Sequence, residues 1–167
     1  PGGVWASVST AIATIDATGL VSGVAAGTSV INYPVTVNGC TTNVSTTVTV
    51  NAMPVVAPIT GTLNVCVGST TQLADATVGG VWASVSTTIA TISGTGLVSG
   101  LSAGTSVINY PVTTNGCTTT ATTTVSVFAL PVVAPITGTL NVCVGETTQL
   151  SDVTPSGVWT SVSTGIA

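Results

Sequence analysis

The stretch that decides the fold runs from residue 79 to residue 92 and reads Gly79-Gly80-Val81-Trp82-Ala83-Ser84-Val85-Ser86-Thr87-Thr88-Ile89-Ala90-Thr91-Ile92. A close copy begins at Gly2 and carries Trp5, and a partial copy later in the chain carries Trp159. The tryptophans are 77 residues apart, since 82 − 5 = 77 and 159 − 82 = 77. The cysteines keep this spacing, since 117 − 40 = 77 and 143 − 66 = 77. A fixed period of this kind is typical of a tandem array of one structural unit.

The period divides the chain into one complete repeat and two partial ones. We expect the later part of a first repeat at 1–50, an apolar linker at 51–54, a complete repeat at 55–127, a linker at 128–130 and the early part of a third repeat at 131–167. The segments around both linkers are apolar and contain two prolines each, which favours stiff joints over flexible ones. The sequence therefore predicts a rod.

The charge composition excludes several classes of function. The chain has no Lys, Arg or His and only four acids, Asp16, Asp75, Glu146 and Asp152. Binding to nucleic acid or to anionic lipid needs basic groups, so we expect neither partner. The longest apolar run, residues 125–136, is interrupted by one serine and two prolines, and it is shorter than the ~20 residues of a membrane span. We therefore expect no direct membrane insertion.

Enzymatic and metal chemistry also lack their usual residues. A hydroxyl nucleophile needs a base, and there is no His or Lys to act as one. Only Asp75 and Asp152 occupy the same repeat position, whereas calcium sites and glycosidases need clustered or facing acids. The cysteines have neither the Cys-x-x-Cys spacing nor the histidines of a zinc site. We expect no catalytic residue, no metal site and no cofactor.

The pattern of residues predicts strands throughout. Val, Ile and Thr dominate, and Gly and Pro interrupt the chain every few residues. Asn38-Gly39 and Asn115-Gly116 each separate two β-prone runs and predict type I′ hairpin turns. Six or seven short strands in about 75 residues, with Trp5, Trp82 and Trp159 as core anchors, indicate an all-β fold of tandem immunoglobulin-like antiparallel β-sandwiches.

The motifs of the complete repeat carry a resemblance to a known family. Trp82-Ala83-Ser84, Ile89-Ala90-Thr91-Ile92 and Gly96-Leu97-Val98-Ser99-Gly100, followed by Ala103-Gly104-Thr105, resemble the signature of bacterial immunoglobulin-like repeats of group 2. The segment from Ile136 to Leu150 is similar to the opening of such repeats in giant surface proteins of Bacteroidetes-type bacteria. The resemblance implies an extracellular or cell-surface location and a role in adhesins, stalks or filaments.

The cysteines predict disulfides, and two pairings stay open. Cys66 with Cys117 would join the first and last strands of one repeat, and Cys40 with Cys66 plus Cys117 with Cys143 would instead connect each repeat to the next. We favour the first pairing, because a small domain gains most from closing its own long loop. Recurring cysteines in a small, charge-poor repeat also favour an oxidising compartment.

The absence of charge on the strands suggests a function. Soluble sandwiches usually protect their edge strands with charges or covering loops. The segment from Cys117 to Val125 is uncharged and strongly β-prone, which predicts self-association into filaments. The alternative is a module that binds a glycan or a host-surface ligand multivalently. Tyr33 and Tyr110 could stack on sugar, but a lone tyrosine on a strand is more often packed by its own fold.

Overall fold

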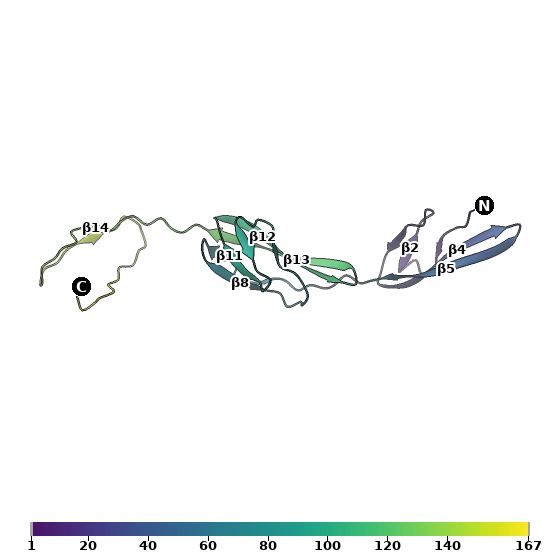
Figure 1. Ribbon diagram of the computed structural model, residues 1–167, viewed down its shortest axis with the longest axis horizontal. Coiled ribbons are helices and arrows are strands. Elements are labelled where there is room, and N and C mark those ends of the chain that lie inside the picture. The colour runs from purple at the N-terminus through teal and green to yellow at the C-terminus, as the bar shows by residue number, and fades with distance from the viewer. Residues whose placement is uncertain (1, 167) are drawn as a thin grey trace. The chain divides into compact units, whose positions relative to one another are not determined.

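The computed structural model describes residues 2–166 and contains strands and no helix in that range (Figure 1). The chain separates into two compact units, residues 1–129 and 130–167. The linker predicted at 51–54 lies inside the first unit, and the second unit begins within the linker predicted at 128–130. The prediction of an all-β fold with several sheets is confirmed.

The complete repeat consists of two four-stranded sheets, as in a β-sandwich. The first has the order β10-β11-β8-β6 and consists of β6 (Thr60–Gly61), β8 (Thr70–Ala74), β10 (Ala90–Ile92) and β11 (Leu97–Gly100). The second has the order β7-β13-β12-β9 and consists of β7 (Asn64–Cys66), β9 (Ala83–Ser84), β12 (Gly104–Thr114) and β13 (Cys117–Phe128).

The first strand changes sheets partway along its length. Its early half, β6, pairs with β8 in the first sheet, and its later half, β7, runs parallel to β13 in the second. Gly61 lies at the change, where a positive φ of 122° and the close approach of the Gln72 carbonyl leave no room for a side chain. The break at this glycine therefore places one strand in both sheets.

The core lies between the two sheets. Its buried side chains come from both, namely Val65, Leu73, Ala90, Val98, Ile108, Val125 and Val127. Alternating residues of each strand face inward, as the two-residue period of a strand requires. Trp82 is half-buried and packs against this cluster, so it closes the side of the core while its ring keeps some exposure.

The first repeat retains the second of these sheets in part. The strands of the first repeat are β1 (Ala6–Ser7), β2 (Ala13–Ile15), β3 (Val21–Gly23), β4 (Gly27–Val37) and β5 (Cys40–Val50). The sheet has the order β1-β4-β5, and β2 pairs with β3. Among the described residues, β5 has one partner strand, β4.

The third repeat forms one short strand pair within residues 130–166. It consists of β14 (Thr137–Gly138) and β15 (Leu150–Ser151), which pair as β6 and β8 do in the complete repeat. Trp159 is 57% exposed there. The role of core anchor predicted for this tryptophan is therefore not fulfilled within the described part of the third repeat.

Both long hairpins turn at the predicted Asn-Gly pairs (Figure 1). Asn38 and Asn115 have φ of 51° and 49°, and Gly39 and Gly116 both have φ of 81°. Two successive positive φ angles are the geometry of a type I′ turn, which matches the twist of the strands on either side.

Candidate interaction surface along strand β13

The main surface feature of the complete repeat is one side of β13. On its inner side β13 pairs with β12 in continuous antiparallel register from Cys117 to Val127. On its other side β7 pairs only with Ser126–Phe128. Within the described chain, the backbone of 117–125 therefore has no strand beside it on that side. We call this stretch of β13 the open edge.

Side chains along the open edge alternate in exposure. Four threonines on one face are exposed, namely Thr118, Thr120, Thr122 and Thr124. The residues between them, Cys117, Thr119, Ala121 and Thr123, are half-buried. The Oγ1 atoms of Thr118 and Thr113 are hydrogen-bonded across the hairpin at 2.8 Å. This face of β13 thus presents a regular row of hydroxyl and methyl groups.

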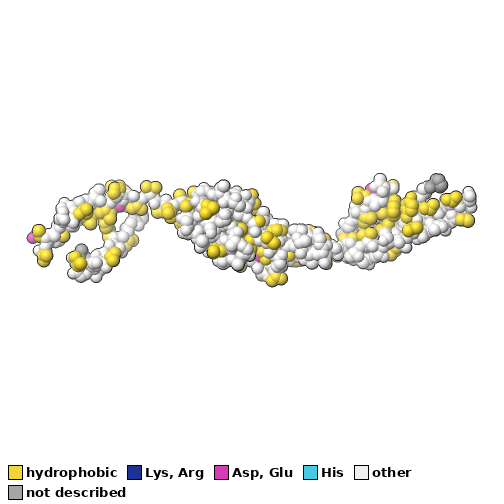
Figure 2. Space-filling model, viewed as in Figure 1, with side chains coloured by type: hydrophobic (Ala, Val, Ile, Leu, Met, Phe, Trp, Pro, Cys, Tyr) yellow, Lys and Arg dark blue, Asp and Glu magenta, His cyan; other side chains and the backbone are white. Residues whose placement is uncertain are grey.

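No charge, proline or bulge protects the open edge. The register with β12 is unbroken, and residues 117–125 contain no acid and no proline. Figure 2 shows a surface almost entirely of apolar and uncharged polar groups, with a few carboxylates. Natural sheets usually carry such devices where an edge would otherwise pair with another chain. The prediction of an exposed, uncharged edge strand here is confirmed.

The carboxylates lie in turns. Oδ1 of Asp75 accepts a hydrogen bond from the N–H of Thr77 at 2.7 Å, and Asp152 accepts one from Thr154 at 2.6 Å. Oδ1 of Asp16 accepts three, from the hydroxyl and N–H of Thr18 and from the N–H of Leu20. The Thr18 hydroxyl, followed by the Leu20 N–H, lowers the pKa of Asp16. Each of these acids stabilises the turn in which it lies by accepting hydrogen bonds from nearby residues.

The tyrosines are used by the fold itself. Tyr110 is 7% exposed, and its ring lies 4.5 Å from that of Trp82 between centroids. Its hydroxyl donates to the Thr77 carbonyl at 2.9 Å and accepts from the Gly80 N–H at 3.2 Å. The expectation that a strand tyrosine is packed by its own fold is confirmed for Tyr110, and stacking of this ring on a sugar is excluded because the ring is buried. Tyr33 makes the same pair with Trp5 at 4.4 Å.

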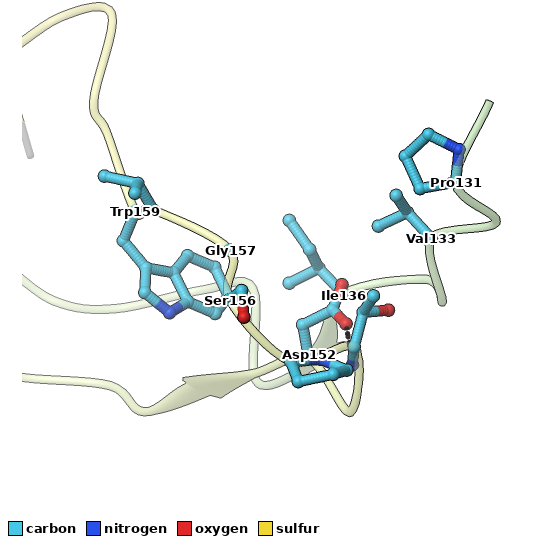
Figure 3. A pocket seen from close by; sticks show the side chains of 10 residues that line it. Pro131, Val133, Ile136, Asp152, Ser156, Gly157 and Trp159 are labelled. Carbon is cyan, nitrogen blue, oxygen red and sulfur yellow. Dashed lines mark hydrogen bonds between the residues drawn. The ribbon is translucent and has the colours of Figure 1, made fainter. Parts of the chain in front are cut away.

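The third repeat contains a pocket of about 490 Å³, lined by Pro131, Val133, Ile136 and Trp159 among others (Figure 3). Its lining residues Thr154, Gly157 and Trp159 are each 77 positions after Thr77, Gly80 and Trp82. In the complete repeat, Tyr110 is contacted by Thr77, Gly80 and Trp82. The pocket is therefore lined in part by the counterparts of the residues that contact the tyrosine of the complete repeat.

Residues 2–166 hold neither a metal cluster nor a membrane-spanning helix. No group of three or more His, Cys, Asp or Glu residues lies close enough together there to hold a metal ion. No helix in that range is long and apolar enough to cross a membrane.

The favoured disulfide is wrong. All four thiols are free in the structure. The parallel register places Cys66 beside Phe128, whereas Cys117 lies at the hairpin end, paired with Thr114. Eleven residues of β13 separate the two sites, about 36 Å at ~3.3 Å per residue, and a disulfide needs Cα atoms within about 7 Å. The alternative bridge between Cys40 and Cys66 is also not formed. Each of these cysteines lies at the end of its repeat that is farther from the joint after residue 50.

Sequence reasoning missed a buried pair of serines. Ser106 is 1% exposed, and its Oγ lies 2.8 Å from Oγ of Ser84 and accepts from the N–H of Ser86 at 3.0 Å. Ser84 in turn donates to the Ala90 carbonyl at 2.6 Å. Ser7 and Ser29 repeat the arrangement at the same distances. The sequence signal that could have indicated this pair is a serine at an inward-facing strand position among Val and Ile residues.

Comparison with known proteins gives limited matches. No family model matches the chain. Ice-binding protein 1 of Shewanella frigidimarina (strain NCIMB 400) is 29% identical over 185 residues, a match that covers 98% of this chain and 20% of that protein. The chain therefore spans about a fifth of the length of this curated relative.

Among solved structures, domains 1–6 of the surface layer protein SbsC align with 93% of this chain and 23% of theirs, at 21% identity and a TM-score of 0.35. A SusE-like surface-located polysaccharide-binding protein of Bacteroides thetaiotaomicron aligns with 76% of this chain and 29% of its own, at 12% identity and a TM-score of 0.40.

Proposed function

We propose that this chain is the structural repeat region of an extracellular bacterial surface filament or giant adhesin stalk, and that its copies associate through the open edge of β13. The observation that carries the proposal is an unprotected edge of nine residues, 117–125, in a chain without any Lys or Arg. Unpaired N–H and C=O groups on such an edge pair readily with a strand of another molecule. The repeat is a non-enzymatic spacer, and its tandem copies form a rod.

Several features support this role. The resemblance of the repeat motifs to bacterial immunoglobulin-like repeats of group 2 supports an extracellular surface location. Asp75, Tyr110 and the Ser84–Ser106 pair serve turns or packing within the complete repeat, whereas the exposed threonines of β13 line an edge whose backbone has no partner strand. Near-identical edges on successive repeats would add their weak pairings together along a filament.

The test places charge on the open edge. A chain carrying Thr120→Lys and Thr122→Lys should form smaller assemblies in sedimentation than the native chain at the same concentration, because only the edge of β5 remains uncharged, and electron microscopy should show fewer fibres. The matched control carries Thr87→Lys and Thr88→Lys in an exposed turn, where the other repeats have Ala11 and Gly165 at the second position. Both variants change the net charge from −4 to −2, so only the site differs.

Two results would contradict the proposal. Native chain that stays monomeric at high concentration would remove the assembly role. Edge variants that assemble as well as the turn control would show that another surface mediates association.

A second candidate function uses the same threonines for binding. The four exposed threonines lie two residues apart, about 6.7 Å, in one straight row. A regular row of hydroxyl and methyl groups suits a repetitive ligand such as a glycan, or ice, the ligand named for the Shewanella relative. A glycan array and an ice-recrystallisation assay on the native chain and the Thr120→Lys, Thr122→Lys variant separate this role from assembly.

A further inference from the structure

The two cysteine positions of a repeat lie at opposite ends of it. Cys66 ends β7 and lies beside Phe128, where β13 leaves the repeat toward the next one. Cys117 begins β13 at the hairpin end. A bridge inside one repeat is therefore impossible without unfolding it, and each cysteine is placed at a boundary between repeats.

The joint after residue 50 shows what the hairpin cysteine meets. The Cys117 thiol lies 3.7 Å from the carbonyl oxygen of Asn51, the residue that follows β5 of the first repeat. The Asn51 side chain donates to the Asn115 carbonyl at 2.9 Å. The hairpin end of one repeat thus contacts the outgoing strand of the repeat before it.

The same outgoing position in the complete repeat is Phe128, since 51 + 77 = 128. Its carbonyl accepts a hydrogen bond at 2.9 Å from the N–H of Val67, the neighbour of Cys66. At the first joint, this carbonyl position is contacted by Cys117, the hairpin cysteine of the following repeat. In the complete repeat, the same position is contacted by Val67, the residue next to Cys66. If successive joints are alike, the hairpin cysteine of one repeat lies at the carbonyl group that the residue next to Cys66 contacts in the repeat before it.

From this coincidence we propose that a disulfide crosses the joint wherever one complete repeat follows another, and that it joins Cys66 of the first to the counterpart of Cys117 in the second. Cys66 lies opposite Phe128 in the parallel strand pair, so the two cysteines would lie beside the same residue, and a disulfide between them requires Cα atoms about 4.4–6.8 Å apart. This pairing differs from a bridge between Cys40 and Cys66, which would join the hairpin cysteine of one repeat to the first-strand cysteine of the following repeat.

The pairing accounts for the free thiols. The partner of Cys66 would be at position 194, since 117 + 77 = 194, and the partner of Cys117 at position −11, since 66 − 77 = −11. Neither position is within residues 1–167. The partners of Cys40 and Cys143 also lie outside residues 1–167. Four free cysteines are thus what this pairing requires within residues 1–167.

The chemistry needs an oxidant, which we name as a small-molecule disulfide such as oxidised glutathione. Two protein thiols and one glutathione disulfide give one protein disulfide and two glutathione thiols, through a mixed disulfide on one cysteine that the other displaces. In the organism this step depends on the proposed extracellular location, whereas the geometry of the joint does not. Each bridge would fix the angle of one joint and stiffen the array.

The experiment extends this chain at Ala167 with a copy of residues 91–129, which completes the third repeat. In a glutathione redox buffer the extended chain, with 4 + 1 = 5 cysteines, should retain three alkylatable thiols, and the unextended chain should retain all four. Mass spectrometry after pepsin digestion should identify one bridge, between the Cys66 peptide and the added hairpin peptide. Cys66→Ser should abolish it with unchanged circular dichroism.

Other bridges would overturn the pairing, above all Cys66 joined to Cys40, Cys117 or Cys143. Five free thiols in a chain whose added strands are protected from hydrogen exchange would also overturn it. If the added strands are unprotected, the bridge map of the native array distinguishes the same two outcomes. Sedimentation in reducing buffer tests the proposed assembly separately, because edge pairing needs no disulfide.

Discussion

The first repeat and the complete repeat carry nearly the same residues in different surroundings. Val98 and Val125 are fully buried in the complete repeat, whereas their counterparts Val21 and Val48 are only half-buried. Strand β5 is exposed along most of its length, although β13 alternates between exposed and covered residues. The difference is β6, β7 and β8, which have no counterpart in the first repeat, whereas β10 and β11 correspond to β2 and β3.

Other features are the same in both repeats. The serine pair has equal distances in each, and the Trp–Tyr centroids lie 4.4 Å and 4.5 Å apart. These contacts involve residues no more than about 30 positions apart, so each half-repeat can form them by itself. Hairpins, turns and the aromatic pair are therefore local, whereas the dry core needs both sheets.

The largest expected effect comes from removing a core side chain of the layer that differs. Leu73 is 1% exposed, and Leu73→Ala should lower the free energy of unfolding of the complete repeat by about 2–5 kcal/mol. Leu150→Ala, 77 positions later, is the matched control, because Leu150 is half-buried in a single strand pair and should cost far less. Native-state hydrogen exchange measures the first loss at the amides of β11 and β12, and the second at the amides of β14 and β15. Equal losses for the two variants would refute the assignment of the core to the paired sheets.

A smaller effect is expected from the tyrosine hydroxyl. Tyr110→Phe removes one bond to the Thr77 carbonyl and one from the Gly80 N–H, and should cost about 0.5–1.5 kcal/mol for each satisfied bond. Tyr33→Phe removes the bond from the Gly3 N–H and serves as the control. Urea unfolding followed by tryptophan fluorescence compares the variants. A cost for Tyr33→Phe as large as that for Tyr110→Phe would mean that the Thr77 bond contributes nothing.

The parts of the fold that could be predicted from sequence are those with a local cause. The Asn-Gly turns follow from the need for two positive φ angles, and the break of the first strand follows from Gly61. The exposed edge followed from a run of threonines without charge. Each of these depends on residues adjacent in the chain, so the sequence pattern contains the necessary information.

The pairing of Cys66 with Cys117 could not be excluded from the sequence, because it depends on which end of a strand each residue occupies. The first and last strands are indeed neighbours, but they run parallel, so Cys66 meets the end of β13 and not its beginning. Strand direction is a property of the whole topology, and the spacing of cysteines does not contain it. Tyr110 is a similar case, since its partners Thr77 and Gly80 lie some 30 residues away.

The smallest expected effect distinguishes two turns that differ by one residue. Asp16 and Ser93 are 77 positions apart, and each accepts hydrogen bonds from the residues two and four positions later. Only the aspartate titrates. Because these bonds lower its pKa below the ordinary value of about 3.9, its contribution to the turn is complete above that value and is lost as the pH falls through the lower, folded-state pKa.

The ratio of hydrogen-exchange protection at Leu20 to that at Leu97 should therefore be constant from pH 7 to about pH 5 and should fall at lower pH. Taking the ratio cancels the intrinsic pH dependence of exchange, since both amides are leucines at matching positions. Asp16→Ser should make the ratio independent of pH, because the turn then has the chemistry of its counterpart. A constant ratio in the native chain would mean that the Thr18 hydroxyl and the backbone N–H groups hold the neutral acid as well as the carboxylate, and that the two turns are equivalent in spite of their different residues.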